Sequence, residues 1–256
     1  MAAIGGGLTH QNEVKAAWYK MTSLIGRILG IEKGTDEYVK AIQKTIEKNG
    51  IAVSLEEVAA DEKSLWVAYS LTDENDENDI SMNSVQAAVD GEALALERQY
   101  ALNNSTGSEK TASKYFVAKF NRSKADRSQK FEIEIGTFQN ENGQVEERDV
   151  YHFSFTADPE VLEADTKEID IQTSIPIEKN QTFLLSEMKY NIFGCTISGS
   201  FSDMAEDDEF WIRGKDDLGN EYVFNLTSYD KPNLIFELQD LGILDHAKQL
   251  TLQLYH

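Results

Sequence analysis

The chain has few of the residues from which catalytic and metal sites are usually assembled. One cysteine, Cys195, occurs in 256 residues, which excludes an internal disulfide, a metal cluster built from cysteines and a redox pair. It lies in an apolar alternation, where a small core residue is commoner than a nucleophile. The four histidines have no metal-type spacing, and no nucleophile elbow or phosphate-binding glycine loop is present. We therefore expect no catalytic residues and no cofactor, and predict that the chain is not an enzyme.

Basic charge and long hydrophobic runs are also scarce. The sequence has 24 Lys and Arg residues against 45 Asp and Glu residues, a formal net charge of −21. This excess repels phosphate backbones and anionic lipid headgroups, so we expect no nucleic acid partner. No stretch approaches the ~18 apolar residues that a membrane span needs. The chain is therefore expected to be soluble and not to insert into a membrane by itself.

The N-terminal part has the pattern of an amphipathic helix. From Val14 to Leu29 the apolar residues recur at helical spacing, and Gly30 follows as a helix stop. Thr35, followed by two acidic residues, is expected to start a second short helix. We predict a flexible leader over residues 1–12 and a helical segment over residues 13–41.

Beyond Lys48 the hydrophobic period changes from that of a helix to that of a strand. Asn49-Gly50 suits a tight hairpin turn, and so do Asn142-Gly143 and residues 218–220. One further helix is conceivable over residues 94–102. In the strand over residues 151–155, His152 is expected to point outward as a solvated imidazole. Alternating apolar residues predict strands over residues 51–55, 65–71, 131–135, 151–155, 169–175, 195–201, 210–212, 222–226, 234–238 and 250–254.

These short strands predict a mostly β fold: an N-terminal amphipathic helix followed by two antiparallel, immunoglobulin-like β-sandwich modules. Pro176 cannot continue a central ladder, so the modules are placed at residues 42–175 and 176–256.

The two modules are also similar in sequence, although chance recurrence of β alternation is an alternative. Residues 58–71 overlay residues 188–201, which aligns Val67 with Ile197. Residues 46–49 recur as residues 177–180, and residues 131–143 resemble residues 210–219 as a strand that runs into a polar turn with glycine. The plan is that of a tandem of related modules.

An acidic loop is the strongest candidate for a ligand site. Asp73, Asn75, Glu77 and Asp79 supply oxygen atoms in a run that follows the strand over residues 65–71. Oxygen-rich loops are what calcium coordinates, which makes these four residues a candidate metal site. The loop departs from an EF-hand, because Asn78 stands where glycine is required. A solvated hairpin loop without bound metal is the alternative.

Several segments resemble the domain of unknown function 4179 family, which comprises extracytoplasmic regions of Gram-positive membrane proteins. The resemblance includes the helix AWYKMTSLIGRILG, the linking segment GTDEYVKAIQKTIEKNG and above all IAVSLEEVAADEKSLWVAYSL, in which Glu57-Val58, Asp61 and the strand at Trp66 follow the family's pattern. The segments YHFSFTADP and KQLTLQLYH are similar to its continuation and to its companion immunoglobulin-like domain. These motifs are packing motifs, and the family offers no catalytic or ligand residues.

Membership would imply a cell-surface protein with one membrane anchor and a cytoplasmic region that modulates a sigma factor. On this hypothesis the chain is the sensory or binding ectodomain of such an anti-sigma-factor-like regulator, and its partner is an unknown protein or cell-wall ligand. The anchor is then expected in the full-length protein. A structural or adhesive surface spacer is the alternative, and a hydrolase that uses dispersed carboxylates is a remote one.

Overall fold

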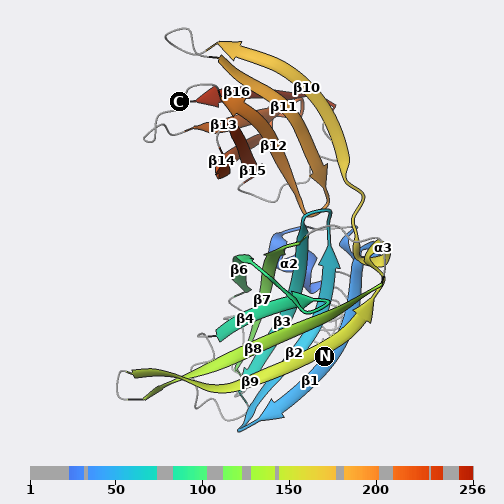
Figure 1. Ribbon diagram of the computed structural model, residues 1–256, viewed down its shortest axis with the longest axis vertical. Helices are drawn as coiled ribbons and strands as arrows, with labels where there is room; N and C mark the ends of the chain where they lie inside the picture. The colour runs from blue at the N-terminus through green and yellow to red at the C-terminus, as the bar shows by residue number, and fades with distance from the viewer. Residues whose placement is uncertain are drawn as a thin grey trace, which may run out of the picture. The chain divides into compact units, whose positions relative to one another are not determined.

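A computed structural model describes residues 23–31, 34–73, 83–102, 112–122, 128–141, 144–176, 182–201, 210–230, 232–238 and 248–255. The structure is mostly antiparallel β-sheet, as predicted (Figure 1). It divides into two compact units, Met1–Glu163 and Ala164–His256. The division falls before the expected boundary at residue 176, because the strand over residues 167–176 pairs with the strand that follows it and so belongs to the second unit.

The first unit contains two sheets that enclose one apolar core. The five-stranded sheet has the order β1-β2-β3-β7-β6, and the four-stranded sheet has the order β5-β4-β8-β9. Residues of both sheets, such as Val67 and Ile133, are fully buried in the shared core, so this unit is a sandwich. Its strands are β1 (Val39–Lys48), β2 (Ile51–Ala60), β3 (Ser64–Asp73), β4 (Asn83–Val89), β5 (Glu92–Leu94), β6 (Leu96–Leu102), β7 (Ala112–Asn121), β8 (Gln129–Glu141) and β9 (Gln144–Ala157).

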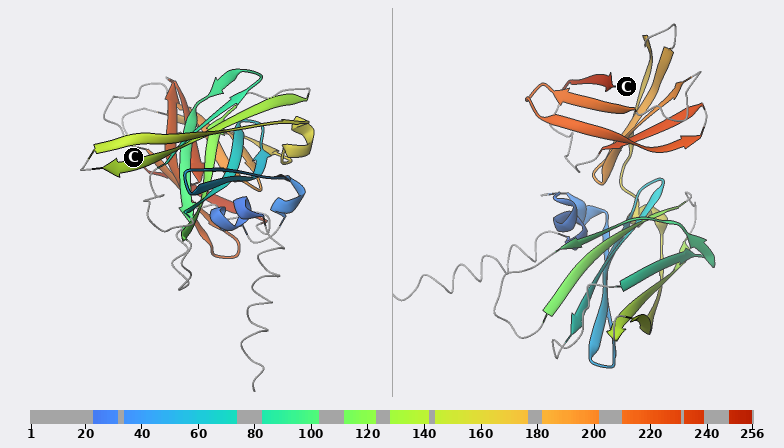
Figure 2. Two further views of the ribbon diagram at one scale, coloured as in Figure 1. Left: turned by 90° about the horizontal axis from the view of Figure 1, so that it is seen from below. Right: turned by 90° about the vertical axis from the view of Figure 1, so that its left-hand side faces the viewer.

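A short helix adds a third layer to this unit. Helix α2 (Leu24–Leu29) packs against the five-stranded sheet (Figure 2). Trp66 is buried on this sheet although it neighbours the core residue Val67 and so lies on the other side of β3. It ends at Gly30, whose φ of 74° confirms the predicted stop. The earlier part of the predicted helix lies outside the described residues. The predicted helical segment is also too long, because β1 begins at Val39.

Two further short elements lie before the first strand and after the last strand of this unit. Thr35–Glu37 is a 3₁₀ turn, η1, that begins after Gly34 without a side-chain cap. At the other end of the unit, α3 (Pro159–Leu162) begins at Asp158, whose carboxylate accepts a hydrogen bond from the Glu160 N–H. Among the described residues, neither α2 nor α3 has the length and apolar character of a membrane span.

The second unit is one curved sheet rather than the two separate sheets expected. Its order is β10-β11-β12-β15-β14-β13-β16, and one apolar core contains residues from most of these strands. The sheet stays continuous because β14 pairs with both β13 and β15. The strands are β10 (Lys167–Pro176), β11 (Thr182–Asn191), β12 (Gly194–Phe201), β13 (Trp211–Asp216), β14 (Glu221–Asp230), β15 (Asn233–Leu238) and β16 (Leu250–Tyr255).

The predicted strands are all present, and the errors concern strands rich in polar residues. Residues 94–102, conceivable as a helix, form the end of β5 and all of β6, since β6 pairs with β7. Strands β1, β4, β7 and β11 were not predicted. The turn at Asn49-Gly50 is confirmed, with both residues at positive φ, and so is the turn at Gly219. The turn at residues 142–143 lies outside the described residues.

The two units repeat one topology, beginning with a three-stranded meander. Strands β1-β2-β3 and β10-β11-β12 pair in the same order. Their first hairpins have bulges after Ala41 and Asp170, with Gln43 and Gln172 at φ values of 51° and 43°. In their second hairpins the register shifts between residues 55 and 57 in one unit and between residues 185 and 187 in the other. The same irregularities at matching positions support a tandem duplication.

The repeat continues through the rest of the second unit. Strands β13, β14, β15 and β16 take the places of β4, β5 with β6, β7 and β8. In the first unit Asp90 Oδ1 accepts a hydrogen bond from the Lys130 N–H at 2.9 Å; in the second, Asp217 Oδ1 accepts one from the Gln249 N–H at 3.3 Å. Leu250 in β16 therefore corresponds to Phe131 in β8.

The alignment of the two units by their strands and bulges can be compared with the three segment matches predicted from the sequence. The match of residues 58–71 to 188–201 is confirmed, because Val58 pairs with Val67 as Met188 pairs with Ile197. The match of residues 46–49 to 177–180 is wrong, since the bulges align Ile46 with Ile175. The likeness of residues 131–143 to 210–219 is also wrong, because β8 corresponds to β16 and β13 corresponds to β4.

Candidate functional site

The predicted calcium ligands are only partly within the described residues. Asp73 is the last residue of β3 and is fully buried, with Ile51 and Ala112 opposite it on the neighbouring strands. Asn75, Glu77 and Asp79 lie outside the described residues. In the part of the chain that the structure describes, no group of three or more His, Cys, Asp or Glu side chains is placed to hold a metal ion.

Cys195 is a core residue, as its sequence context predicted. It lies on β12 in the core of the second unit, and its side chain is buried. Burial raises the pKa of the thiol to about 12. Since the thiolate is the reactive form, this cysteine is inert at neutral pH.

His152 lies on the outward face of the four-stranded sheet, where the sequence placed it. Its Nδ1 is 3.0 Å from Oε1 of Glu134, which is directly opposite on β8. The two side chains retain 65% and 48% of their exposure, so water weakens this contact. Glu132 follows on the same face, where it pairs with Lys130 at 2.6 Å.

His152, Glu132 and Glu134 line a hollow of about 660 Å³ that belongs wholly to the first unit. Ala88 and Ala93 leave room on β4 and β5, while Glu132 and Glu134 supply negative charge. Leu94 and Leu96 add apolar surface. The sequence predicted that His152 faces outward but did not predict the hollow, because the hollow forms only when strands of both sheets come together.

Glu57 anchors the helix to the sheet. It lies at the β2 bulge, and its Oε2 accepts a hydrogen bond from the Ile25 N–H at 3.2 Å. Burial raises the pKa of this carboxyl, although backbone hydrogen bonds from Ile25 and Leu24 oppose the shift. Ser23 caps the same helix through the Gly26 N–H. The role of Glu57 is therefore to position the helix.

Asp216 organises the turn between β13 and β14. Its carboxylate accepts hydrogen bonds from the backbone N–H groups of Leu218 and Asn220, from the Asn220 side chain and from the Tyr222 hydroxyl, at 2.7–2.9 Å. Burial alone would raise its pKa, but these hydrogen bonds outweigh burial and lower the pKa to about 2. Burial and the bond to Asp216 raise the pKa of Tyr222 to about 12.

Three lysines close one side of the sandwich. The Nζ atoms of Lys40, Lys44 and Lys48 on β1 donate hydrogen bonds to backbone carbonyls of β9. Lys44, for example, reaches the Ser154 carbonyl at 2.9 Å. Both strands are sheet edges, so the lysines occupy carbonyls that another strand could otherwise bind. Because side chains alternate along a strand, the spacing of four residues places the three lysines on one side of β1.

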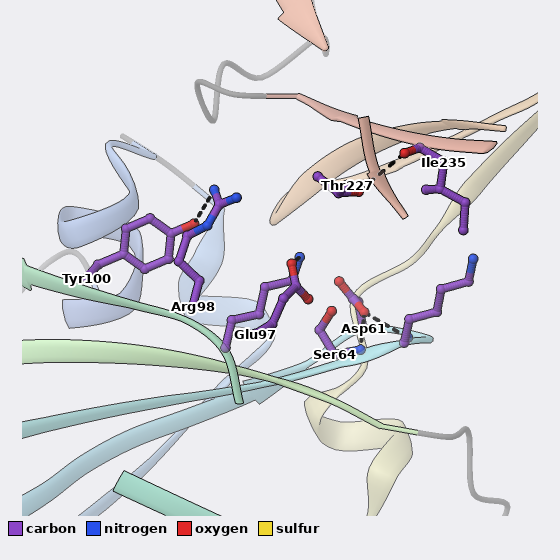
Figure 3. A network of polar contacts seen from close by, with 9 residues as sticks. Asp61, Ser64, Glu97, Arg98, Tyr100, Thr227 and Ile235 are labelled. Atoms are coloured by element: carbon purple, nitrogen blue, oxygen red, sulfur yellow. Dashed lines mark hydrogen bonds and ion pairs between the residues drawn. The ribbon is translucent and has the colours of Figure 1, made fainter. Parts of the chain in front are cut away.

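Further polar contacts stabilise turns and edges (Figure 3). Asp61 Oδ1 accepts hydrogen bonds from the Lys63 and Ser64 N–H groups, which closes the β2–β3 turn. On β6, Arg98 donates to the Tyr100 hydroxyl at 3.4 Å, and Glu97 pairs with a lysine of β7. All of these groups contribute to the fold.

Comparison with known proteins indicates the fold alone. No protein-family model and no curated protein matches the chain. A solved structure described as the crystal structure of the conserved domain protein from Bacillus anthracis superposes with a TM-score of 0.60 and 18% sequence identity. The match covers 88% of this chain and 83% of that one. The bacterial protein therefore shares this arrangement across most of its length.

Proposed function

We propose that the chain is a binding module without catalytic activity: the extracytoplasmic, sensory part of a bacterial membrane-anchored regulator. The hollow in the first unit carries this proposal, because it combines room, apolar surface and charge in one place. Glu57, Asp216 and Cys195, whose pKa values are shifted, are all used for packing or internal hydrogen bonds. Immunoglobulin-like recognition modules share the general plan of antiparallel sheets around an apolar core.

The chemistry of the hollow favours a basic ligand. Glu132 and Glu134 lie on its lining, and the whole chain carries a formal charge of −21. Such a field attracts cationic groups and raises their rate of encounter. A basic protein segment or an amine-bearing cell-wall component fits this site.

Membership of the domain of unknown function 4179 family remains part of the proposal, since it rests on the sequence segments quoted above. It places the chain at the cell surface of a Gram-positive bacterium, with a sigma factor as the regulated target of the full-length protein. Cross-linking the tagged full-length protein in its native cells, followed by mass spectrometry, tests this directly. Recovery of a sigma factor or signalling protein supports the proposal, whereas recovery of only glycan or host proteins contradicts it.

The hollow itself is tested by charge removal. Replacing Glu132 and Glu134 with glutamine should abolish the cross-links made by the first unit while leaving the fold unchanged. Glu221→Gln is the matched control, since Glu221 is an exposed carboxylate outside the hollow. If the double variant retains every cross-link, the hollow is not the binding site.

A structural or adhesive spacer is the second candidate. The tandem duplication favours it, because repeated β modules are a common way to span distance at a cell surface. Deleting the second unit from the full-length protein distinguishes the two roles. A spacer should lose reach or adhesion, whereas a sensory module should lose its response to ligand with adhesion unaffected.

A further inference from the structure

The duplication reveals a difference between the units at one sheet edge. In the first unit the outer edge of β8 pairs with β9 along thirteen residue pairs, from Gln129 with Ala157 to Glu141 with Gln144. Strand β16 takes the place of β8 in the second unit, and it pairs with β13 on one side. No strand in the described part of the second unit pairs with its other side. The position that corresponds to β9 is thus open at the edge of this sheet.

Burial at the two equivalent strands differs accordingly. The inward residues of β8, Phe131, Ile133 and Ile135, are all fully buried. Their counterparts on β16 are Leu250, Leu252 and Leu254, which pack against the core but are only partly buried. The sheet therefore leaves apolar surface at the edge where the first unit places aromatic residues of β9.

Strand β16 also lacks the protection that the other sheet edges have. Natural edge strands are guarded by shortness, charge, proline or bulges. Strand β5 has three residues, β6 carries Glu97 and Arg98, and β10 has a bulge and ends at Pro176. The lysines of β1 occupy carbonyls of β9. By contrast, β16 reads LTLQLY, with no charge, no proline and no shift in register.

Strand β10, at the opposite edge of the second unit, also differs from its counterpart β1 in a way that suits an added apolar strand. The β1 and β10 bulges align Lys40 with Ile169, so the residue that reaches β9 in the first unit is replaced by an apolar one. Ile169 is 46% exposed and is among the few large apolar residues at the surface of the described chain. A strand in the β9 position would meet an apolar side chain here instead of an ammonium group.

We propose that the outer edge of β16 binds an extended segment of a partner protein, which adds an antiparallel strand to the second unit. The model for the occupant is β9, which places Phe155, Phe153 and Tyr151 opposite the three inward residues of β8. The partner segment should therefore carry large apolar or aromatic residues at every second position, opposite Leu250, Leu252 and Leu254. A second copy of this chain fits less well, since each copy carries a formal charge of −21.

This surface is on a different unit from the hollow, so the two proposals stand or fall separately. The probe for the β16 edge is a synthetic peptide with the β9 sequence DVYHFSFTA and two lysines added at each end for solubility. Hydrogen exchange of the full chain is followed with and without the peptide. We expect slower exchange over residues 250–255 and no change in β6, which is the guarded edge of the first unit.

Two controls test the chemistry of the edge. A peptide with serine at the positions of Phe153 and Phe155 should bind about tenfold more weakly or worse, because the apolar cross-strand pairs are lost. In the chain, Leu252→Lys installs the charge that guards natural edges and should abolish peptide binding. Val161→Lys, at an exposed apolar residue of α3 outside both the hollow and the β16 edge, should leave binding intact. The serine peptide needs no change in the chain, so it remains decisive if Leu252→Lys fails to fold.

Three results would overturn the proposal. The first is the absence of any change in exchange over residues 250–255. The second is a change over β8 instead, which would mean that the peptide only displaces β9. The third is a concentration-dependent dimer that protects β16 without peptide, which would make a second copy of the chain the occupant.

Discussion

Two acidic side chains in this protein have opposite pKa shifts because burial and hydrogen-bond donors act against each other and balance differently at each. Glu57 receives backbone N–H groups from one short helix, and burial still dominates, so its pKa is raised. Asp216 receives four hydrogen bonds, including one from a tyrosine hydroxyl, and its pKa falls to about 2. The balance between burial and hydrogen-bond donors therefore decides which charge state the fold prefers.

Glu57→Gln should stabilise the first unit at neutral pH. The folded-state pKa is raised, so the stability contributed by this group is present below its ordinary value of 4.5 and is lost as the pH rises through the raised pKa. Glutamine keeps an acceptor for the Ile25 N–H without a charge. Thermal melts at pH 7 should show a higher Tm for the variant, and the gain should shrink toward pH 4. A lower Tm at pH 7 would show that the carboxylate charge is needed at the helix.

Asp216→Asn should destabilise the second unit at neutral pH. The folded-state pKa is lowered, so the contribution of this carboxylate is present above its ordinary value of 3.8 and is lost as the pH falls toward about 2. Denaturant titrations should show that the wild type loses stability between those values and that the variant, already weaker at pH 7, changes less. Glu221→Gln, at an exposed carboxylate on the same strand pair, should behave as the wild type.

At the scale of elements, the helix propensity of a segment does not predict its conformation where neighbouring strands pair with it. The β6 sequence LERQYAL is rich in good helix formers, yet β7 pairs with it through backbone hydrogen bonds. Strand β1 repeats lysine every fourth residue, a spacing compatible with one helix face, yet it pairs with β2, and strand alternation places those lysines on one side. Each element takes the conformation that satisfies its backbone groups in the sheet.

Lys44→Met should weaken the closure between β1 and β9. The variant loses the hydrogen bond to the Ser154 carbonyl, a loss of about 1 kcal/mol in the free energy of unfolding for an exposed bond. It also frees part of the β9 edge, so hydrogen exchange near Ser154 should rise, and light scattering should show more self-association. Lys63→Met, in the exposed β2–β3 turn, is the matched control. Equal exchange rates in both variants would show that the lysines do not protect the edge.

At the scale of the whole molecule, the duplication yields two cores that can be perturbed one at a time. Gly199→Ala places a Cβ 2.4 Å from Phe183 Cζ and 2.7 Å from the Leu184 carbonyl oxygen, both in the second unit. This overpacking should cost about 2 kcal/mol, or roughly 10 °C in Tm for a unit of this size. Calorimetry should show a shift in one transition only. Ile133→Ala, in the core of the first unit, should shift the other. A common shift in both variants would mean that the cores unfold together.

The sequence by itself determined the mostly β class, the positions of ten strands, two of the turns and the helix stop at Gly30. Each is a local property: alternation buries one face of a strand, and glycine tolerates positive φ. The match between residues 58–71 and 188–201 could also be seen in the sequence. The apolar residues alternate in the same way in both segments, and the strand pairing follows that alternation.

Only the tertiary structure decided the division at Glu163, the curved single sheet of the second unit, the hollow that both sheets of the first unit line, and the open edge of β16. These features depend on which strands become neighbours in a sheet. That pairing is set by contacts between residues far apart in the chain. An edge strand and a central strand can have the same apolar alternation in sequence. They differ in whether the fold places one or two neighbouring strands beside them.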